Sequence, residues 1–128
     1  MRAVLDTSVF VADEQGRQLD TSGIPEEAAV SVVTLAELEL GVHLASSGPV
    51  RAARLATLRA VQTSYESLRI DDAVASSFAQ IVANARAEGR RPKVQDAWIA
   101  ATAHAHAAAV VTQDDDFDTF VEIDVIRV

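Results

Sequence analysis

The sequence predicts an α/β domain, a three-layer sandwich in which helices cover both faces of a mostly parallel sheet of four to five strands. Short apolar runs that do not alternate with polar residues, such as 3–5, 29–33 and 108–112, are typical of strands buried on both faces. Segments with apolar residues at helical spacing stand between these runs. Because strands and helices alternate, the strands are expected to be parallel. The chain of 128 residues has the size of one domain, so we expect a single domain over 1–128.

The N-terminal segment predicts a strand, a turn and the start of a helix. Residues 3–5 form the strand, which ends at Asp6, and the apolar residues 9–12 begin the helix. The stretch 13–27 is polar and contains glycine and proline, which favours a loop or a frayed helix end.

The next segment predicts a second buried strand followed by a helical hairpin. The strand covers 29–33, and Thr34-Leu35-Ala36-Glu37 matches a capping box that predicts a helix start. Gly48-Pro49 is expected to end this helix, and 51–63 forms its partner.

The C-terminal half continues the alternation. We expect Asp96 to be the N-cap of an alanine-rich helix. The expected elements are, in order, a short strand, a long helix, the alanine-rich helix, a buried strand, a loop with one helical turn and a final edge strand, at 66–70, 71–89, 97–107, 108–112, 113–118 and 122–128.

Composition excludes several classes of protein. No apolar run is long enough to span a membrane, and no signal-peptide pattern is found before Asp6, so we expect a cytoplasmic protein with no membrane partner. Without cysteine there is no disulfide and no thiolate metal site. Nineteen acidic residues against eleven basic ones give a net charge of -8, which argues against nucleic-acid binding unless acidic residues converge on a divalent cation.

Three acidic positions are expected to meet at one edge of the sheet. Asp6 follows the first strand, the run Asp114–Asp116 follows the strand 108–112, and Asp96 begins the helix before that strand. Taken singly, each acid could be a turn or capping residue, and Glu37 could be the reciprocal half of its capping box. Together, carboxylates in one cleft repel each other unless a cation binds there.

The kinds of side chain favour a hard cation and give no support to other chemistry. Oxygen ligands without cysteine or paired histidines select Mg²⁺ or Mn²⁺ rather than zinc. His104 and His106 point to opposite sides of a helix and His43 stands alone, so packing or surface roles are expected. No glycine-rich phosphate loop and no nucleophile elbow occurs.

The chain resembles the PIN-domain ribonucleases and, among them, the VapC toxins of bacterial VapBC toxin-antitoxin systems. The resemblance runs from end to end. It rests on four motifs at matching positions in order, which are Leu5–Ser8, Thr34–Leu38, Gln95–Ala101 and Val111–Phe117.

The resemblance implies a PIN-like fold and an Mg²⁺- or Mn²⁺-dependent endoribonuclease that hydrolyses phosphodiester bonds in RNA. It makes Asp6, Glu37, Asp96 and one acid of 114–116 the metal-binding catalytic set. It also implies a VapB-type antitoxin partner, and a homodimer that can form a heterotetramer or larger assembly with it. The hydroxyls that would orient the carboxylates are those of Thr7, Ser8 and Thr112. Binding of RNA also requires basic residues, and the candidates just before Asp96 are Arg86, Arg90, Arg91 and Lys93. A solvated helix end, where cations are favourable at the C-terminal dipole, explains these four residues equally well.

The run of three aspartates leaves the fourth acid open between Asp114 and Asp116. Asp114 shares the strand parity of Thr112, so both should project the same way while Asp115 turns away. Asp116 has that parity too, but Phe117 is expected to turn inward as an anchor, with a bend before it. We therefore rank Asp114 as the fourth acid and Asp116 as an additional or substitute ligand.

Two other functions remain as alternatives. A degenerate PIN-like module would bind a partner without cutting RNA, but all the acids of the motif are present. An aspartyl phosphotransferase with Asp6 as nucleophile would want a second acid two residues later, where Ser8 stands.

Overall fold

The computed structural model describes residues 2–128, and its strands form one sheet of five parallel strands in the order β3-β2-β1-β4-β5. This confirms the predicted α/β sandwich. The strands, in chain order, are β1 Arg2–Leu5, β2 Glu27–Ser31, β3 Glu66–Leu68, β4 Ala109–Thr112 and β5 Val125–Arg127.

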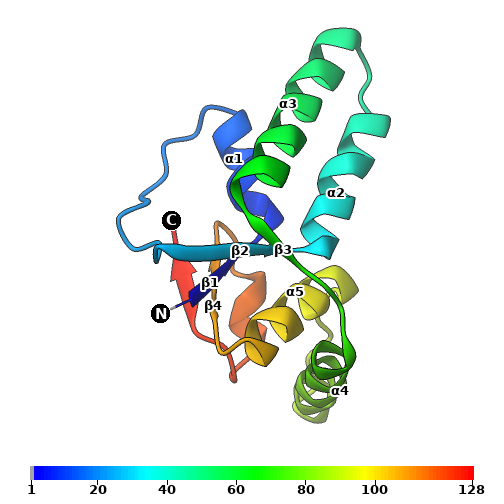
Figure 1. Ribbon diagram of the computed structural model, residues 1–128. Helices are drawn as coiled ribbons and strands as arrows, with labels where there is room; N and C mark the ends of the chain where they lie inside the picture. The colour runs from blue at the N-terminus through cyan, green and yellow to red at the C-terminus, as the bar shows by residue number, and fades with distance from the viewer. Residues whose placement is uncertain (1) are drawn as a thin grey trace.

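Helices cover both faces of the sheet, with α1, α2 and α3 on one side and α4 and α5 on the other (Figure 1). Helices α2 and α3 pack against each other as the predicted hairpin. The helices are α1 Thr7–Glu14, α2 Val32–His43, α3 Gly48–Ser64, α4 Asp72–Ala87, α5 Val94–Ala105 and the short 3₁₀ helix η1 Asp116–Thr119.

Two hydrophobic cores lie on opposite faces of the sheet, because side chains alternate along its central strands. In β1, Leu5 packs in the core under α1 to α3, while Val4 packs in the core under α4 and α5. In β4, Val111 and Val110 divide in the same way. Both central strands are therefore buried on both faces, as their continuous apolar runs predict.

Several element boundaries differ from the sequence expectations. Helix α2 begins earlier than the capping box indicates, because Ser31 is the N-cap and its hydroxyl accepts the Val33 N–H at 3.1 Å. Gly48-Pro49 begins α3 instead of ending a pattern, with Ser47 as the N-cap. Within residues 2–128, no helix is long and apolar enough to cross a membrane.

Candidate active site

The site lies at the carboxyl edge of the sheet, where β1 and β4 run side by side. Asp6 follows β1 and is only 3% exposed, and its backbone N–H donates to the Val111 carbonyl at 2.8 Å. Asp114 follows β4 on the adjacent loop. The parallel topology therefore brings together two acids that lie more than a hundred residues apart in the sequence.

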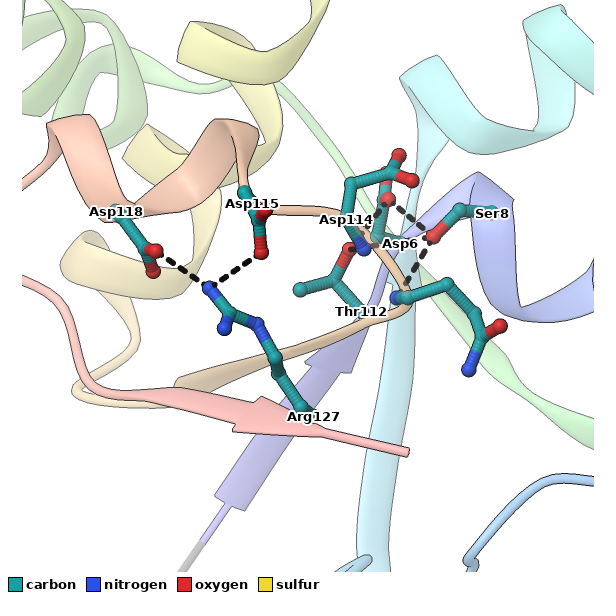
Figure 2. A network of polar contacts seen from close by, with 8 residues as sticks. Asp6, Ser8, Thr112, Asp114, Asp115, Asp118 and Arg127 are labelled. Atoms are coloured by element: carbon teal, nitrogen blue, oxygen red, sulfur yellow. Dashed lines mark hydrogen bonds and ion pairs between the residues drawn. The ribbon is translucent and has the colours of Figure 1, made fainter.

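Two hydroxyls hold the Asp6 carboxylate in place (Figure 2). Asp6 Oδ2 accepts the Ser8 hydroxyl at 2.7 Å and the Thr112 hydroxyl at 3.0 Å. These hydroxyls in turn accept backbone N–H groups, Ser8 from Gln113 at 3.1 Å and Thr112 from Asp114 at 3.0 Å. Position 6 is the N-cap of α1, but its side chain makes no capping bond. Ser8 and Thr112 are two of the hydroxyls expected to orient the carboxylates, and both donate to Asp6.

Glu37 faces the same region from α2. Its Oε1 accepts the Thr7 hydroxyl at 2.8 Å, and Thr7 Oγ1 lies 3.1 Å from the hydroxyl of the fully buried Thr34. Burial raises the pKa of Glu37 and the charge of Asp6 adds to this rise, while the bond from Thr7 opposes it. Because Ser31 is the N-cap of α2, Glu37 is not the reciprocal half of a capping box, and that interpretation is wrong.

Asp96 is the most perturbed acid of the site. It lies in the first turn of α5, whose N-cap position is Lys93, so the expected capping role of Asp96 is wrong. Its Oδ2 is buried and has no hydrogen-bond partner among residues 2–128. Burial, followed by repulsion from Asp6 and Asp116, raises the pKa of Asp96 to about 6.

The loop after β4 divides its aspartates between different surroundings. Loss of water, and then repulsion from Asp6 and Asp116, raise the pKa of Asp114. Asp116 Oδ2 accepts from Lys93 Nζ at 3.2 Å, and this contact raises the pKa of Lys93. Asp115 turns away and pairs with Arg127 at 3.1 Å. The orientations of Asp114 and Asp115 agree with the strand parity.

The basic residues are placed unequally around the acids. Lys93 and Arg91 line a hollow of about 270 Å³ together with Asp96 and Asp116. The side chain of Arg90 is committed elsewhere, since its Nη1 donates to the Thr119 carbonyl at 3.1 Å and its Nη2 pairs with a glutamate. Arg86, in the last turn of α4, instead lines a separate hollow of about 70 Å³ that Arg91 also borders.

The acids do not form a closed binding site for a divalent cation by themselves. Within residues 2–128, no group of three or more acidic or histidine side chains is placed to hold a metal ion. Mg²⁺ does not require such a group, because it keeps several waters and binds one or two carboxylates together with substrate phosphates. The unpartnered Asp96 Oδ2 and the mutual repulsion of the acids fit a cation with that kind of coordination.

Sequence reasoning missed Arg127, which contacts Asp115 and Asp118 from β5 (Figure 2). No local pattern points to it, because the contact depends on how β5 pairs with β4. The sequence also gave no sign that Lys93 pairs with Asp116, two residues that lie 23 positions apart.

Comparisons with known proteins show the family of the chain. Residues 3–122 match the PIN domain family. The chain is 48% identical to Ribonuclease VapC5 of Mycobacterium tuberculosis over 128 residues, covering 98% of this chain and 94% of the relative. It is 43% identical to Ribonuclease VapC4 of the same species over 127 residues, covering 99% and 97%.

Solved structures give the same result. The crystal structure of VapBC-5 from Mycobacterium tuberculosis, a member of the VapBC family of toxin-antitoxin systems, superposes with a TM-score of 0.91 at 45% identity and covers 100% of both chains. FitAcB from Neisseria gonorrhoeae gives a TM-score of 0.79 at 29% identity, covering 97% of this chain and 96% of the other. The chain belongs to the PIN-domain family and, within it, to the VapC ribonucleases.

Proposed function

We propose that this chain is the toxin of a toxin-antitoxin pair and cleaves RNA with Mg²⁺ or Mn²⁺ held by Asp6, Glu37, Asp96 and Asp114, with Asp116 as an additional or substitute ligand. The observation that carries the proposal is the Asp96 carboxylate, which is half-buried, repelled by neighbouring acids and unpartnered at Oδ2. A purely structural carboxylate would be expected to have a hydrogen-bond partner for that atom.

The bound cation would supply Lewis-acid chemistry at the scissile phosphate and a more acidic water. The Asp6 carboxylate is oriented for binding by the Ser8 and Thr112 hydroxyls, which fix its Oδ2 before any ligand arrives. Glu37 has a raised pKa and is suited to take up the proton of the attacking water. Thr7 orients that carboxylate through Oε1.

RNA requires positive charge beside the acids, and Lys93 and Arg91 provide it at the hollow next to Asp96. Asp116 holds Lys93 close to the acidic site in the absence of RNA. We assign the contacts with RNA phosphates to Lys93 and Arg91 in preference to the other two arginines. Arg90 and Arg86 remain weaker candidates, because one is committed to other contacts and the other lines a separate hollow.

An antitoxin partner is proposed from two kinds of support. The VapBC-5 structure, which is 45% identical to this chain, is described as a member of the VapBC family of toxin-antitoxin systems. An acidic pocket with an unpartnered carboxylate attracts a cationic side chain. We propose a small antitoxin that places an arginine or lysine near the acids, and a homodimeric toxin that assembles with it into a heterotetramer or larger complex.

Cleavage by the purified chain is expected to require a divalent cation. Total RNA incubated with Mg²⁺ or Mn²⁺ should gain new 5′ ends, and sequencing these ends identifies the cleaved bonds. Excess chelator should prevent the formation of these ends, and Mn²⁺ added at a higher concentration than the chelator should restore it. Undiminished cleavage in chelator would refute the metal role. A folded protein that does not cleave RNA with either Mg²⁺ or Mn²⁺ would instead support the non-catalytic module.

Separate asparagine substitutions at the three aspartates should rank their roles. We expect the largest loss of cleavage for Asp114→Asn, a partial loss for Asp116→Asn, whose charge is shared with Lys93, and little change for Asp115→Asn. Initial cleavage rates on one RNA at saturating Mg²⁺ measure the ranking. If Asp116→Asn caused the largest loss of cleavage, the metal would be assigned a position closer to Asp96. If Asp115→Asn caused the largest loss, the result would contradict the geometry of the loop.

A further inference from the structure

An arginine outside the acidic site contacts the loop that carries two of its carboxylates. Arg127, on the edge strand β5, places Nη2 3.1 Å from Asp115 Oδ1 and also pairs with Asp118 Oδ2 (Figure 2). Nothing in the proposed mechanism uses this arginine. Its partners flank Asp116 on either side in the sequence, and Asp115 directly follows Asp114.

The loop needs a cation on its outer side because four of the five residues 114–118 are aspartates. Like charges this close destabilise one fixed arrangement of the loop. In the structure, Arg127 forms ion pairs with Asp115 and Asp118, and Lys93 forms an ion pair with Asp116. Asp114 has no cationic partner among the ion pairs of residues 2–128 and is left beside Asp6.

We propose that Arg127 is a positioning residue that fastens the 114–118 loop to β5, so that Asp114 and Asp116 stay directed toward the metal site. The inference rests on the proposed metal-dependent function. Phe117 anchors the inner side of the loop in the core, where it is fully buried. Arg127 provides the outer attachment, and the two together leave the loop few alternative positions.

The size of the effect is limited by exposure. The Arg127 side chain is 46% exposed and Asp115 is 88% exposed, so each ion pair alone contributes little. Two pairs from one arginine to one loop form a small network, for which a measurable contribution is expected. We therefore expect roughly fivefold weaker Mn²⁺ binding in Arg127→Gln, below the range found for groups that touch a metal ligand directly.

In Arg127→Gln, the change of charge alone would affect Mn²⁺ binding in the opposite direction to a loss of positioning. This variant therefore separates a charge effect from a positioning effect. Removing Arg127 makes the neighbourhood more negative, which by itself tightens Mn²⁺ binding. Removing both partner charges, in Asp115→Asn/Asp118→Asn, makes it less negative. Loss of positioning weakens Mn²⁺ binding in both variants. Measurements at about 0.5 M salt, where the Debye length is roughly 4 to 5 Å, also reduce the long-range charge effect.

The experiment uses the full chain and two readouts. The first is amide hydrogen exchange of 113–120 in metal-free protein, where the Asp114 N–H bonds to Thr112 Oγ1 and the Asp118 N–H bonds to the Asp115 carbonyl. The second is Mn²⁺ affinity by calorimetry. We expect faster exchange and weaker binding in Arg127→Gln and in the double variant, and partial recovery in Arg127→Lys, which retains the charge.

The matched control is Arg2→Gln, which removes an exposed arginine of a similar ion pair, to Glu27 at 3.4 Å, at the opposite end of β1 from Asp6. Unchanged exchange of 113–120 in Arg127→Gln overturns the proposal. Faster exchange with unchanged or tighter Mn²⁺ binding overturns it as well. If the native protein binds no Mn²⁺, the proposed metal-dependent function fails, while the exchange data still decide whether Arg127 fastens the loop.

Discussion

Replacing Asp96 with asparagine is expected to lower RNA cleavage by at least about 100-fold. Loss of a residue that only supports a metal ligand costs up to about this much, and we assign Asp96 as a ligand itself. Asparagine keeps the size of the side chain but removes the charge and one carboxylate oxygen. The unpartnered Oδ2 is the atom that we assign to the cation, so its loss removes a direct contact. Initial cleavage rates at several Mg²⁺ concentrations measure the effect.

The same substitution is expected to leave the metal-free protein folded and to make it more stable. The pKa of Asp96 is about 6 in the folded protein, above its ordinary value of 3.8. A raised carboxyl pKa means that the charged form disfavours folding, fully so above pH 6, and that this cost fades as the pH falls toward 4. Asparagine removes the cost. Allowing for solvent screening at a half-buried site, we expect a gain on the order of 1 kcal/mol at pH 7.

Asp13→Asn is the matched control, since it makes the same chemical change at an exposed position of α1. It should change neither cleavage nor the melting temperature. Asp6→Asn should also lower cleavage strongly, because it removes the charge, while its amide oxygen still accepts the Ser8 and Thr112 hydroxyls that donate to Asp6 Oδ2. Full cleavage by Asp96→Asn would remove Asp96 from the metal site. A fall in melting temperature from pH 5 to pH 7 that is larger in the native protein than in Asp96→Asn would support the assigned cost.

The sequence predicted which of these acids lie close together where topology controls their placement. Parallel strands put their carboxyl ends on one edge, so Asp6 and Asp114 had to meet once β1 and β4 were recognised as neighbouring buried strands. The resemblance to the PIN-domain family supplied the hydroxyls of Ser8 and Thr112. Family resemblance supplied Glu37, since its spacing from Thr34 alone also fits a capping box.

The sequence failed where two local signals compete or where a contact is distant. Both Ser31 and Thr34 can cap a helix, and the three-residue difference is set by where β2 ends. Proline stops one helix or starts the next, and at Pro49 the loop is short enough that it starts α3. Arg127 reaches Asp115 and Asp118 only because β5 pairs in register with β4, which no short pattern encodes.

The anchor of the acidic loop gives the second large effect, because Phe117 joins the metal site to the core. Phe117 is fully buried on the α4 and α5 side of the sheet, with its ring centroid 6.2 Å from that of Phe120. Phe117→Ala removes this ring and leaves a cavity, which should cost about 3 to 5 kcal/mol in the free energy of unfolding. A small domain has only about 5 to 15 kcal/mol in total.

Urea unfolding measures this cost, and Val121→Ala is the control, since Val121 lies just beyond η1 and is 68% exposed. The control should change the free energy of unfolding by less than about 0.5 kcal/mol. At a temperature where Phe117→Ala is still folded, its cleavage should also fall, because the loop that carries Asp114 and Asp116 loses its anchor in the core. A cost below about 1 kcal/mol would mean that the loop is positioned from outside, by Arg127 and Lys93, and that the buried ring contributes little to holding the acids.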